Sequence, residues 1–236
     1  MINRKNIIII SVLLITALTF VFCFSALSTT SANRVDGDKI KVVLDAGHGG
    51  VDNGVSGVKT KVKESELNLK VVKKLENYLI SAGIEVVLTR SSSAGLYGVA
   101  TTNLKKKDMQ KRKEIILNAK PSLVVSVHMN KFSVSTRRGA QVFYKANDQA
   151  SKKLADSIQQ CFNGMKEASR QCESLVGDYY ILNCSNYPSV IAECGFLSNP
   201  EDEALLVTDA YQDAIAYSIF KGIIGYFSIE SIKFCD

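Results

Sequence analysis

Residues 40–50 read IKVVLDAGHGG, a short β-branched apolar run that passes directly into a glycine-rich segment. The run predicts a buried strand, because continuous apolar stretches of this length bounded by turn residues are typical of strands covered on both faces. The glycines predict a loop immediately after it. His48 is therefore expected near the carboxyl end of a strand, the edge at which open α/β sheets hold their functional groups.

Strand-like and helical patterns alternate along the rest of the chain. Apolar residues recur at helical spacing from about residue 65 to 82, and Gly83 is placed to end that helix. Further helices are predicted over 108–118, 149–162 and 211–227, strands over 84–89, 123–127, 140–144, 179–182 and 190–192, a surface loop over 91–107, and a turn at 199–200. This alternation predicts a single α/β domain over residues 38–230, with a twisted, mostly parallel sheet flanked by helices.

The N-terminal segment, residues 1–32, has a different character. Arg4 and Lys5 precede an almost uninterrupted apolar run from residue 7 to 27. The run predicts an apolar helix that is either a cleaved secretory signal or an uncleaved anchor in the membrane. Small residues at 28–32 permit cleavage, so both interpretations stay open beside a third, a buried helix of a soluble protein. The first two place the rest of the chain outside the cytoplasm.

The composition describes an ordinary globular protein with a mild positive charge. Of the 236 residues, 46% are hydrophobic and 22% charged, which suits one sizeable domain. The net charge of +6 is spread along the chain except for a cluster at 105–107. This charge fits a solvated surface, and it also fits an exported protein that meets anionic wall polymers. Basic and aromatic residues are not interleaved as in nucleic-acid-binding proteins, so no nucleic-acid partner is expected.

Cysteine spacing argues against a structural zinc site. Six cysteines are present, one of them inside the N-terminal apolar run, and no two have CxxC spacing. The spacing therefore gives little support to a zinc ribbon. A disulfide between Cys161 and Cys172 stays open, although free buried thiols are favoured, because cysteine is among the residues most often found in cores.

The chain has two histidines, His48 and His128, and each is expected where a buried strand ends. Strand ends at one sheet edge can bring both rings together around a metal ion. Helical phase selects Glu64 over Glu66 as a third ligand, because Glu64 falls on the apolar face of its helix and Glu66 on the polar face. Two histidines and one carboxylate, with a fourth position open to water, are typical of catalytic zinc.

Glu193 is a candidate general base. It follows the apolar strand 189–192, where a buried carboxylate needs a metal, a cation or a catalytic role. As a base, it would take a proton from the attacking water and pass it to the leaving amine. The alternative is a structural salt bridge to Arg90 or Arg112.

Several motifs together resemble the zinc-dependent N-acetylmuramoyl-L-alanine amidases of the amidase 3 type. The matching segments, spread in order over residues 40–227, are VLDAGHGGVDNG (43–54), Glu64 with Asn68-Leu69, LTR (88–90), VSVHMN (125–130) and AECGFLSN (192–199). The resemblance implies hydrolysis of the bond between N-acetylmuramic acid and L-alanine in peptidoglycan. It also implies one Zn²⁺ ion on His48, Glu64 and His128, a catalytic Glu193, and Arg90 as a supporting residue at the site rim.

Two positions depart from the family pattern without removing a required group. Ala46 stands where proline is usual, and Cys194 follows the catalytic glutamate. Cys194 is not expected to be a ligand, because neighbouring residues of a strand point to opposite faces.

The short chain without wall-binding repeats resembles the germination-specific subgroup of spore-forming bacteria. That resemblance implies a role in spore cortex peptidoglycan, in muramic-δ-lactam formation, near the forespore membrane. An accessory or activating protein is compatible with it. The polar, loop-rich segments 91–111 and 145–178 are candidate regulatory or docking surfaces. Two other functions stay open: a zinc peptidase that cuts within wall peptides, and a non-catalytic wall-binding protein.

Overall fold

The computed structural model describes residues 39–168 and 170–233. The helices and strands follow in the order β1 (Lys41–Ala46), α2 (Glu64–Ser81), β2 (Glu85–Leu88), α3 (Leu104–Ala119), β3 (Leu123–Asn130), β4 (Gln141–Tyr144), α4 (Gln149–Asn163), β5 (Leu175–Val176), α5 (Tyr180–Asn183), β6 (Ser189–Phe196), α6 (Pro200–Leu206) and α7 (Asp209–Lys233). The predicted N-terminal apolar helix and its membrane span at 7–27 lie outside the described residues. Among the helices of the described part, none is long and apolar enough to cross a membrane.

The six strands form one sheet in the order β2-β1-β3-β6-β4-β5. Strands β2, β1, β3 and β6 pair in parallel, whereas β4 runs antiparallel to β6 and carries β5 in parallel at the edge. The sheet is therefore mostly parallel, as the alternating sequence pattern predicts. Because β1, β3 and β6 are parallel neighbours, the loop after β1 and the last residues of β3 and β6 lie together at the carboxyl-terminal edge of the sheet.

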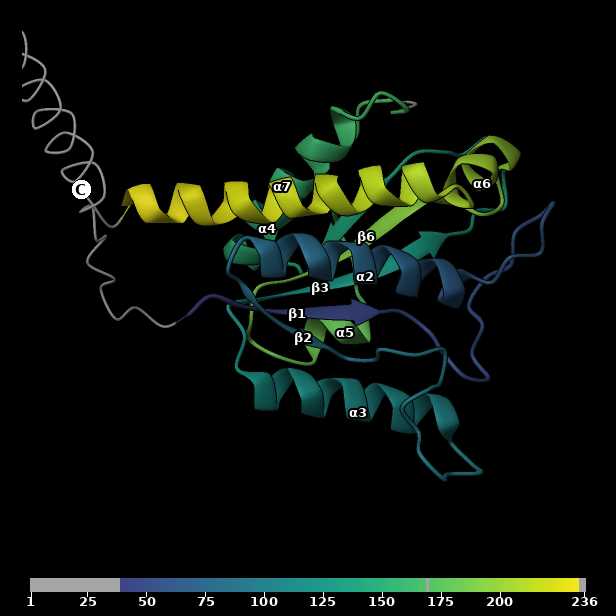
Figure 1. Ribbon diagram of the computed structural model, residues 1–236, viewed down its shortest axis with the longest axis horizontal. Coiled ribbons are helices and arrows are strands. Elements are labelled where there is room, and N and C mark those ends of the chain that lie inside the picture. Colours follow the sequence, from purple (N-terminus) through teal and green to yellow (C-terminus); the bar gives the residue numbers. More distant parts are fainter. Residues whose placement is uncertain (1–38, 169, 234–236) are drawn as a thin grey trace, which may run out of the picture. The chain divides into compact units, whose positions relative to one another are not determined.

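Helices cover both faces of the sheet, and Figure 1 shows the resulting layers. Helices α2, α4 and α7 pack together on one face, where Val42, Leu44 and Val127 belong to the larger apolar core. Helices α3 and α5 cover the other face over a smaller cluster that includes Val43 and Val124. The alternation of strand side chains assigns Val42 and Val43 to opposite cores, so both faces of β1 are buried.

This alternation also decides which face carries the polar site. On the side of α3 and α5, the strands present the pocket-lining side chains of Asp45, His128, Ile191 and Glu193. Cys194 is fully buried in the core on the opposite side, which confirms that it points away from Glu193. The polar groups therefore gather near the carboxyl ends of β1, β3 and β6, under α3 and α5.

Most predicted elements are confirmed, and the differences concern short segments. Residues 179–182 were expected as a strand, but 180–183 form the helix α5. Helix α3 begins at Leu104, four residues before its predicted start, and β5 and α6 were not predicted. Segments of two to seven residues, such as β5, α5 and α6, give too little periodicity to separate a strand from a short helix, so neighbouring elements decide. The four described cysteines are free thiols.

Candidate active site

The glycine-rich loop after β1 brings His48 to the site in an unusual backbone conformation. His48 has a φ of 61°, in the left-handed region that non-glycine residues rarely adopt. Gly47 allows the close approach of the loop to β3, because a Cβ at this position would lie 2.2 Å from the ring of His128. The two histidine rings consequently lie with centroids 5.0 Å apart, almost perpendicular to each other.

Glu64, the first residue of α2, lies between the two histidines. One of its oxygens, Oε1, is 2.9 Å from His128 Nδ1 and 3.2 Å from His48 Nε2. The other oxygen accepts a hydrogen bond from the Val55 amide at 2.9 Å. Glu64 is 2% exposed, whereas Glu66 is exposed on the helix surface, in agreement with their helical phase. Burial alone would raise the pKa of Glu64, but the facing His128 and His48 hold it well below its usual range.

The donor atoms of His48, Glu64 and His128 lie within 4.8 Å of one another and fit a metal ion. Bonds of about 2.0–2.1 Å in a zinc tetrahedron place neighbouring donors about 3.3 Å apart, close to the spacings around Glu64. Asp52 lies 2.9 Å from His48 Nδ1, as expected for a carboxylate that orients a ligating imidazole through its second nitrogen. Burial lowers the pKa of His48, but Glu64 and Asp52 outweigh it and raise that pKa.

Arg90 lies behind this loop, and not at the rim of the site. Its side chain is buried, and it donates hydrogen bonds to the carbonyls of Ala46 at 2.8 Å and Gly47 at 2.9 Å. Its guanidinium also donates hydrogen bonds to the carbonyls of Ser65 and Ser92. Since its donors all face the backbone, Arg90 holds the loop in place and does not line the pocket.

A second buried arginine, Arg112 of α3, holds the same loop from the other side. It donates to the carbonyls of Ala46 at 2.9 Å and His48 at 2.6 Å, and it forms ion pairs with Asp45 and Asp108. These bonds stabilise the strained conformation of His48 by satisfying its carbonyl.

Asp45 is the buried counter-ion of Arg112. It also accepts hydrogen bonds from Thr89 and Ser126, each at 2.6 Å. Burial opposes its ionisation, but Arg112 and the two hydroxyls lower the pKa of Asp45 to about 2. The sequence carried a signal for this residue that went unused, because a carboxylate at the end of an apolar strand needs a partner, the same argument that identified Glu193.

Glu193 of β6 lies opposite His128 of β3 in the parallel register. Its Oε2 is buried without a hydrogen-bond partner among the described residues. Among the described residues, no ion pair joins Glu193 to Arg90 or Arg112. The guanidinium groups of both arginines bind other partners. The salt-bridge alternative is therefore wrong. Burial raises the pKa of Glu193 to about 7, in spite of the opposing effect of His128.

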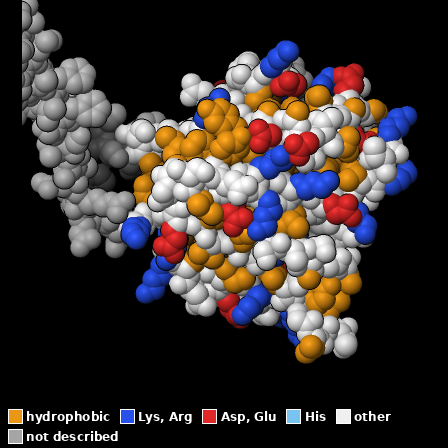
Figure 2. All heavy atoms as spheres, in the orientation of Figure 1, with side chains coloured by type: hydrophobic (Ala, Val, Ile, Leu, Met, Phe, Trp, Pro, Cys, Tyr) orange, Lys and Arg blue, Asp and Glu red, His pale blue; other side chains and the backbone are white. Residues whose placement is uncertain are grey.

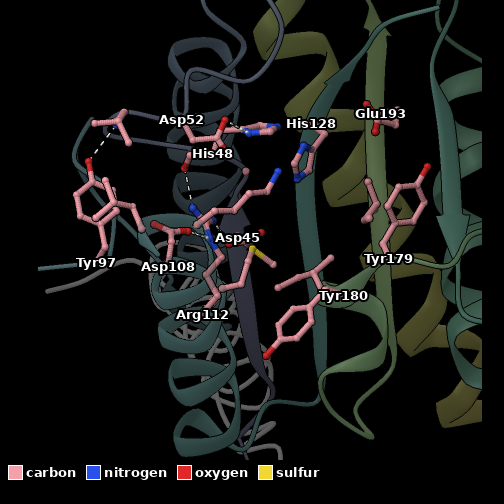
Figure 3. A pocket seen from close by; sticks show the side chains of 17 residues that line it. Asp45, His48, Asp52, Tyr97, Asp108, Arg112, His128, Tyr179, Tyr180 and Glu193 are labelled. Carbon is pink, nitrogen blue, oxygen red and sulfur yellow. Dashed lines mark hydrogen bonds and ion pairs between the residues drawn. The ribbon is translucent and has the colours of Figure 1, made fainter. Parts of the chain in front are cut away.

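A pocket of about 400 Å³ opens beside these groups, and His48, His128 and Glu193 line it. Figure 3 shows the two histidines at its centre, with Glu193 and Tyr179 to one side and Tyr97 to the other. Helices α3 and α5 supply half of the remaining lining residues. Glu64 is buried between the histidines and is not part of the lining. The pocket thus combines a candidate metal site, an unpaired carboxylate and room for a ligand.

Comparison with known proteins identifies relatives of this chain. The profile of a family described as N-acetylmuramoyl-L-alanine amidase matches residues 42–225. A germination-specific N-acetylmuramoyl-L-alanine amidase of Bacillus subtilis is 34% identical over 191 residues, which are 79% of each chain. The amidase AmiA of Escherichia coli is 27% identical, over 82% of this chain and 78% of its own.

Solved structures give the same relationship. The CwlD amidase of Clostridioides difficile, solved in complex with the GerS lipoprotein, superposes with a TM-score of 0.78 at 37% identity. The match covers 81% of this chain and 100% of that one. An N-acetylmuramoyl-L-alanine amidase of Clostridium difficile 630 has a TM-score of 0.73 at 28% identity, over 81% and 98% of the two chains.

Proposed function

The chain belongs to the N-acetylmuramoyl-L-alanine amidase family of peptidoglycan-cleaving enzymes, and we propose that it works with one zinc ion held by His48, Glu64 and His128. The observation that carries this proposal is the convergence of these three donors beside the unpaired Glu193 in one pocket. Imidazole nitrogens and a carboxylate are ligands that zinc prefers in hydrolases. When bound, zinc supplies Lewis acidity to the scissile carbonyl and to the attacking water.

Glu193 acts as the general base and then as the general acid. Its buried carboxylate, with a pKa raised to about 7, can accept a proton from water near neutral pH. The oxygen of that water adds to the carbonyl carbon of the lactyl group, and the bond from this carbon to the alanine nitrogen breaks. Glu193 returns the proton to the departing nitrogen, so that the products are a free lactyl carboxylate and a peptide with an N-terminal alanine.

Two variants test these roles separately. Glu193→Ala should bind zinc stoichiometrically and lose hydrolysis, whereas His128→Ala should lose both. Glu66→Ala, an exposed carboxylate on the same helix as Glu64, is the matched control and should behave as wild type. An active Glu193→Ala enzyme would refute the assigned base, and full zinc binding by His128→Ala would refute the assigned ligand set.

Mass analysis of digested peptidoglycan tests the bond that is cut. Release of intact stem peptides with free N-terminal alanine is the expected result. Cleavage within the peptide would identify a zinc peptidase instead, and binding without cleavage would identify a wall-binding protein.

The biological setting of this enzyme is the spore cortex, where it contributes to muramic-δ-lactam formation before germination. The 34% identity to a germination-specific amidase supports this part of the proposal. The enzyme acts outside the cytoplasm, exported or anchored through residues 1–32, which lie outside the described part. Muropeptides from spores that lack the gene should contain no muramic-δ-lactam, and spores with the usual lactam content would contradict this role.

An accessory protein assists the enzyme in this proposal. A relative with 37% identity has been solved in complex with a lipoprotein, which supports the idea of a partner. The purified chain should then bind zinc weakly or cleave slowly until the partner is added. Stoichiometric zinc and full activity in isolation would argue against a required activator.

A further inference from the structure

Lys105 brings a positive charge to the wall of the active-site pocket from the first turn of α3. We propose that Lys105 forms a carboxylate-binding subsite, which receives an acidic group of the peptide on the leaving side of the scissile bond. The inference deepens the proposed function and rests on it, because it assigns a substrate feature to a residue of the same pocket.

Helical phase turns Lys105 toward the pocket and Lys107 away from it. Residues 105, 108, 109 and 112 all line the pocket, and they share one face of α3 because they are three, four and seven positions apart. Lys107 lies about 200° around the helix from Lys105 and is not part of the lining. The cluster at 105–107 therefore contains one residue that faces the site, whereas Lys107 belongs to the solvated surface.

Apart from Glu193, the proposed base, the other charged groups of the pocket already have partners. Arg112 is engaged by Asp45, Asp108 and two backbone carbonyls. Asp108 also accepts the Leu96 amide at 2.6 Å. Asp52 pairs with His48 and reaches Lys105 only through longer-range electrostatics. Within residues 39–168 and 170–233, Lys105 has no ion pair within 4.0 Å, so its ammonium group can receive an anion from a ligand.

The substrate supplies such an anion. A peptide released by an amidase has at least a C-terminal carboxylate, and acidic side chains add others. The hydroxyl of Tyr97, on the same side of the pocket as α3, accepts a hydrogen bond from the amide of Val51 at 3.0 Å and offers a bound carboxylate a hydroxyl donor but no cationic group. Of the lysines and arginines that line the pocket, Lys105 is thus the one with a charge left to pair. A lysine binds a carboxylate through a charge-assisted hydrogen bond.

Paired substrates isolate this interaction. One probe is a muramoyl dipeptide with L-alanine followed by an acidic residue whose carboxylates are free, and the other is the same compound with both carboxylates amidated. Wild type should have a kcat/KM roughly tenfold higher on the acidic probe, since a charge-assisted contact in a partly enclosed pocket gives about that factor. The difference should lie mainly in KM, because the contact forms before the reaction.

The variants are Lys105→Met and its matched control Lys107→Met. Methionine has nearly the helix propensity of lysine, so α3 is retained in both. Lys105→Met should lose the preference for the acidic probe, because its kcat/KM falls far more on the acidic probe than on the amidated one, whereas Lys107→Met should keep the preference. Lys105→Arg should restore most of the preference, because it restores the charge.

Binding to the zinc-loaded Glu193→Gln protein, measured by titration calorimetry, separates this inference from the proposed function. Binding of the acidic probe that weakens with Lys105→Met supports the subsite, even if wild type cleaves neither probe and the proposed function fails. Equal binding and cleavage of both probes by an active wild type would overturn the subsite and leave the proposed function intact. An equal loss on both probes in Lys105→Met would also overturn it.

Discussion

Arg112 donates a hydrogen bond of 2.6 Å to the main-chain carbonyl of His48. This bond links the buried ion pair with Asp45 to the backbone that presents a candidate metal ligand. His48 stays in the left-handed region because the surrounding structure fixes it, and such conformations are worth about 1–3 kcal/mol of strain. The geometry of the candidate metal site is therefore supported by groups outside the candidate ligand set.

Replacement of Arg112 by methionine tests this dependence. The change leaves Asp45 and Asp108 buried without a cation, so the free energy of unfolding should fall by about 3–5 kcal/mol. Zinc affinity should fall about 10- to 100-fold, because the loop carbonyls lose their donor. Denaturant unfolding and a zinc competition assay measure the two effects. Lys113→Met on the exposed side of α3 is the control, and an Arg112→Met protein with wild-type zinc affinity would contradict the link.

The stability of the metal-free protein should decrease in acid because of Asp45. Its pKa is lowered from 3.8 to about 2 in the folded state. A group with a depressed folded pKa contributes stability above its unfolded pKa, and the contribution is lost as pH falls from about 4 to 2. Its size is about 2 kcal/mol. The stability difference between wild type and Asp45→Asn should shrink over this interval in urea titrations, and a constant difference would show that Asp45 is not the group responsible.

Replacement of Gly54 by any larger residue should disturb the candidate metal site, because Gly54 lies directly against two of its side chains. Its φ is 65°, and a Cβ there would lie 2.3 Å from Glu64 Oε2 and 2.8 Å from His48 Cδ2. Gly54→Ala should therefore displace both side chains and weaken zinc binding at least tenfold, in the range seen when groups around a metal site are disturbed. Gly98→Ala is the matched control, because Gly98 has a φ of 57° with no atom within 4 Å. It should lose about 1 kcal/mol of stability from backbone strain and keep its zinc affinity.

Zinc should stabilise the folded protein in proportion to its binding. At free zinc about 100 times its dissociation constant, the free energy of unfolding should rise by about 2.7 kcal/mol. Glu64→Ala should lose this gain, because it removes the carboxylate between the two histidines, whereas Glu66→Ala should keep it. Thermal unfolding with chelator and with added zinc measures the difference. A gain that persists in Glu64→Ala would place the zinc elsewhere.

The distribution of charged side chains shows a limit of prediction from composition. Figure 2 shows Lys and Arg side chains interspersed with Asp and Glu on the face in view, as expected for a solvated surface. The net charge of +6 does not reveal that Lys105 faces the pocket and Lys107 does not. That difference comes from helical phase and from the position of α3 over the sheet.

The sequence by itself determined the longer elements and the candidate donors. Periodicity is a local property, so β1, α2, β3 and β6 could be predicted from the residues within them. Helical phase separated Glu64 from Glu66 for the same reason, and strand alternation separated Glu193 from Cys194.

Only the tertiary structure decided the short elements and the supporting groups. The helix α5 stood where a strand was expected, because four residues cannot express a period and their packing against β6 and α3 selects the conformation. Arg90, expected at the rim, turns its donors to the loop backbone because the buried carbonyls of Ala46 and Gly47 need partners. Arg112 and Asp45 lie 67 positions apart, so their pairing depends on how α3 docks on the sheet, which no local pattern contains.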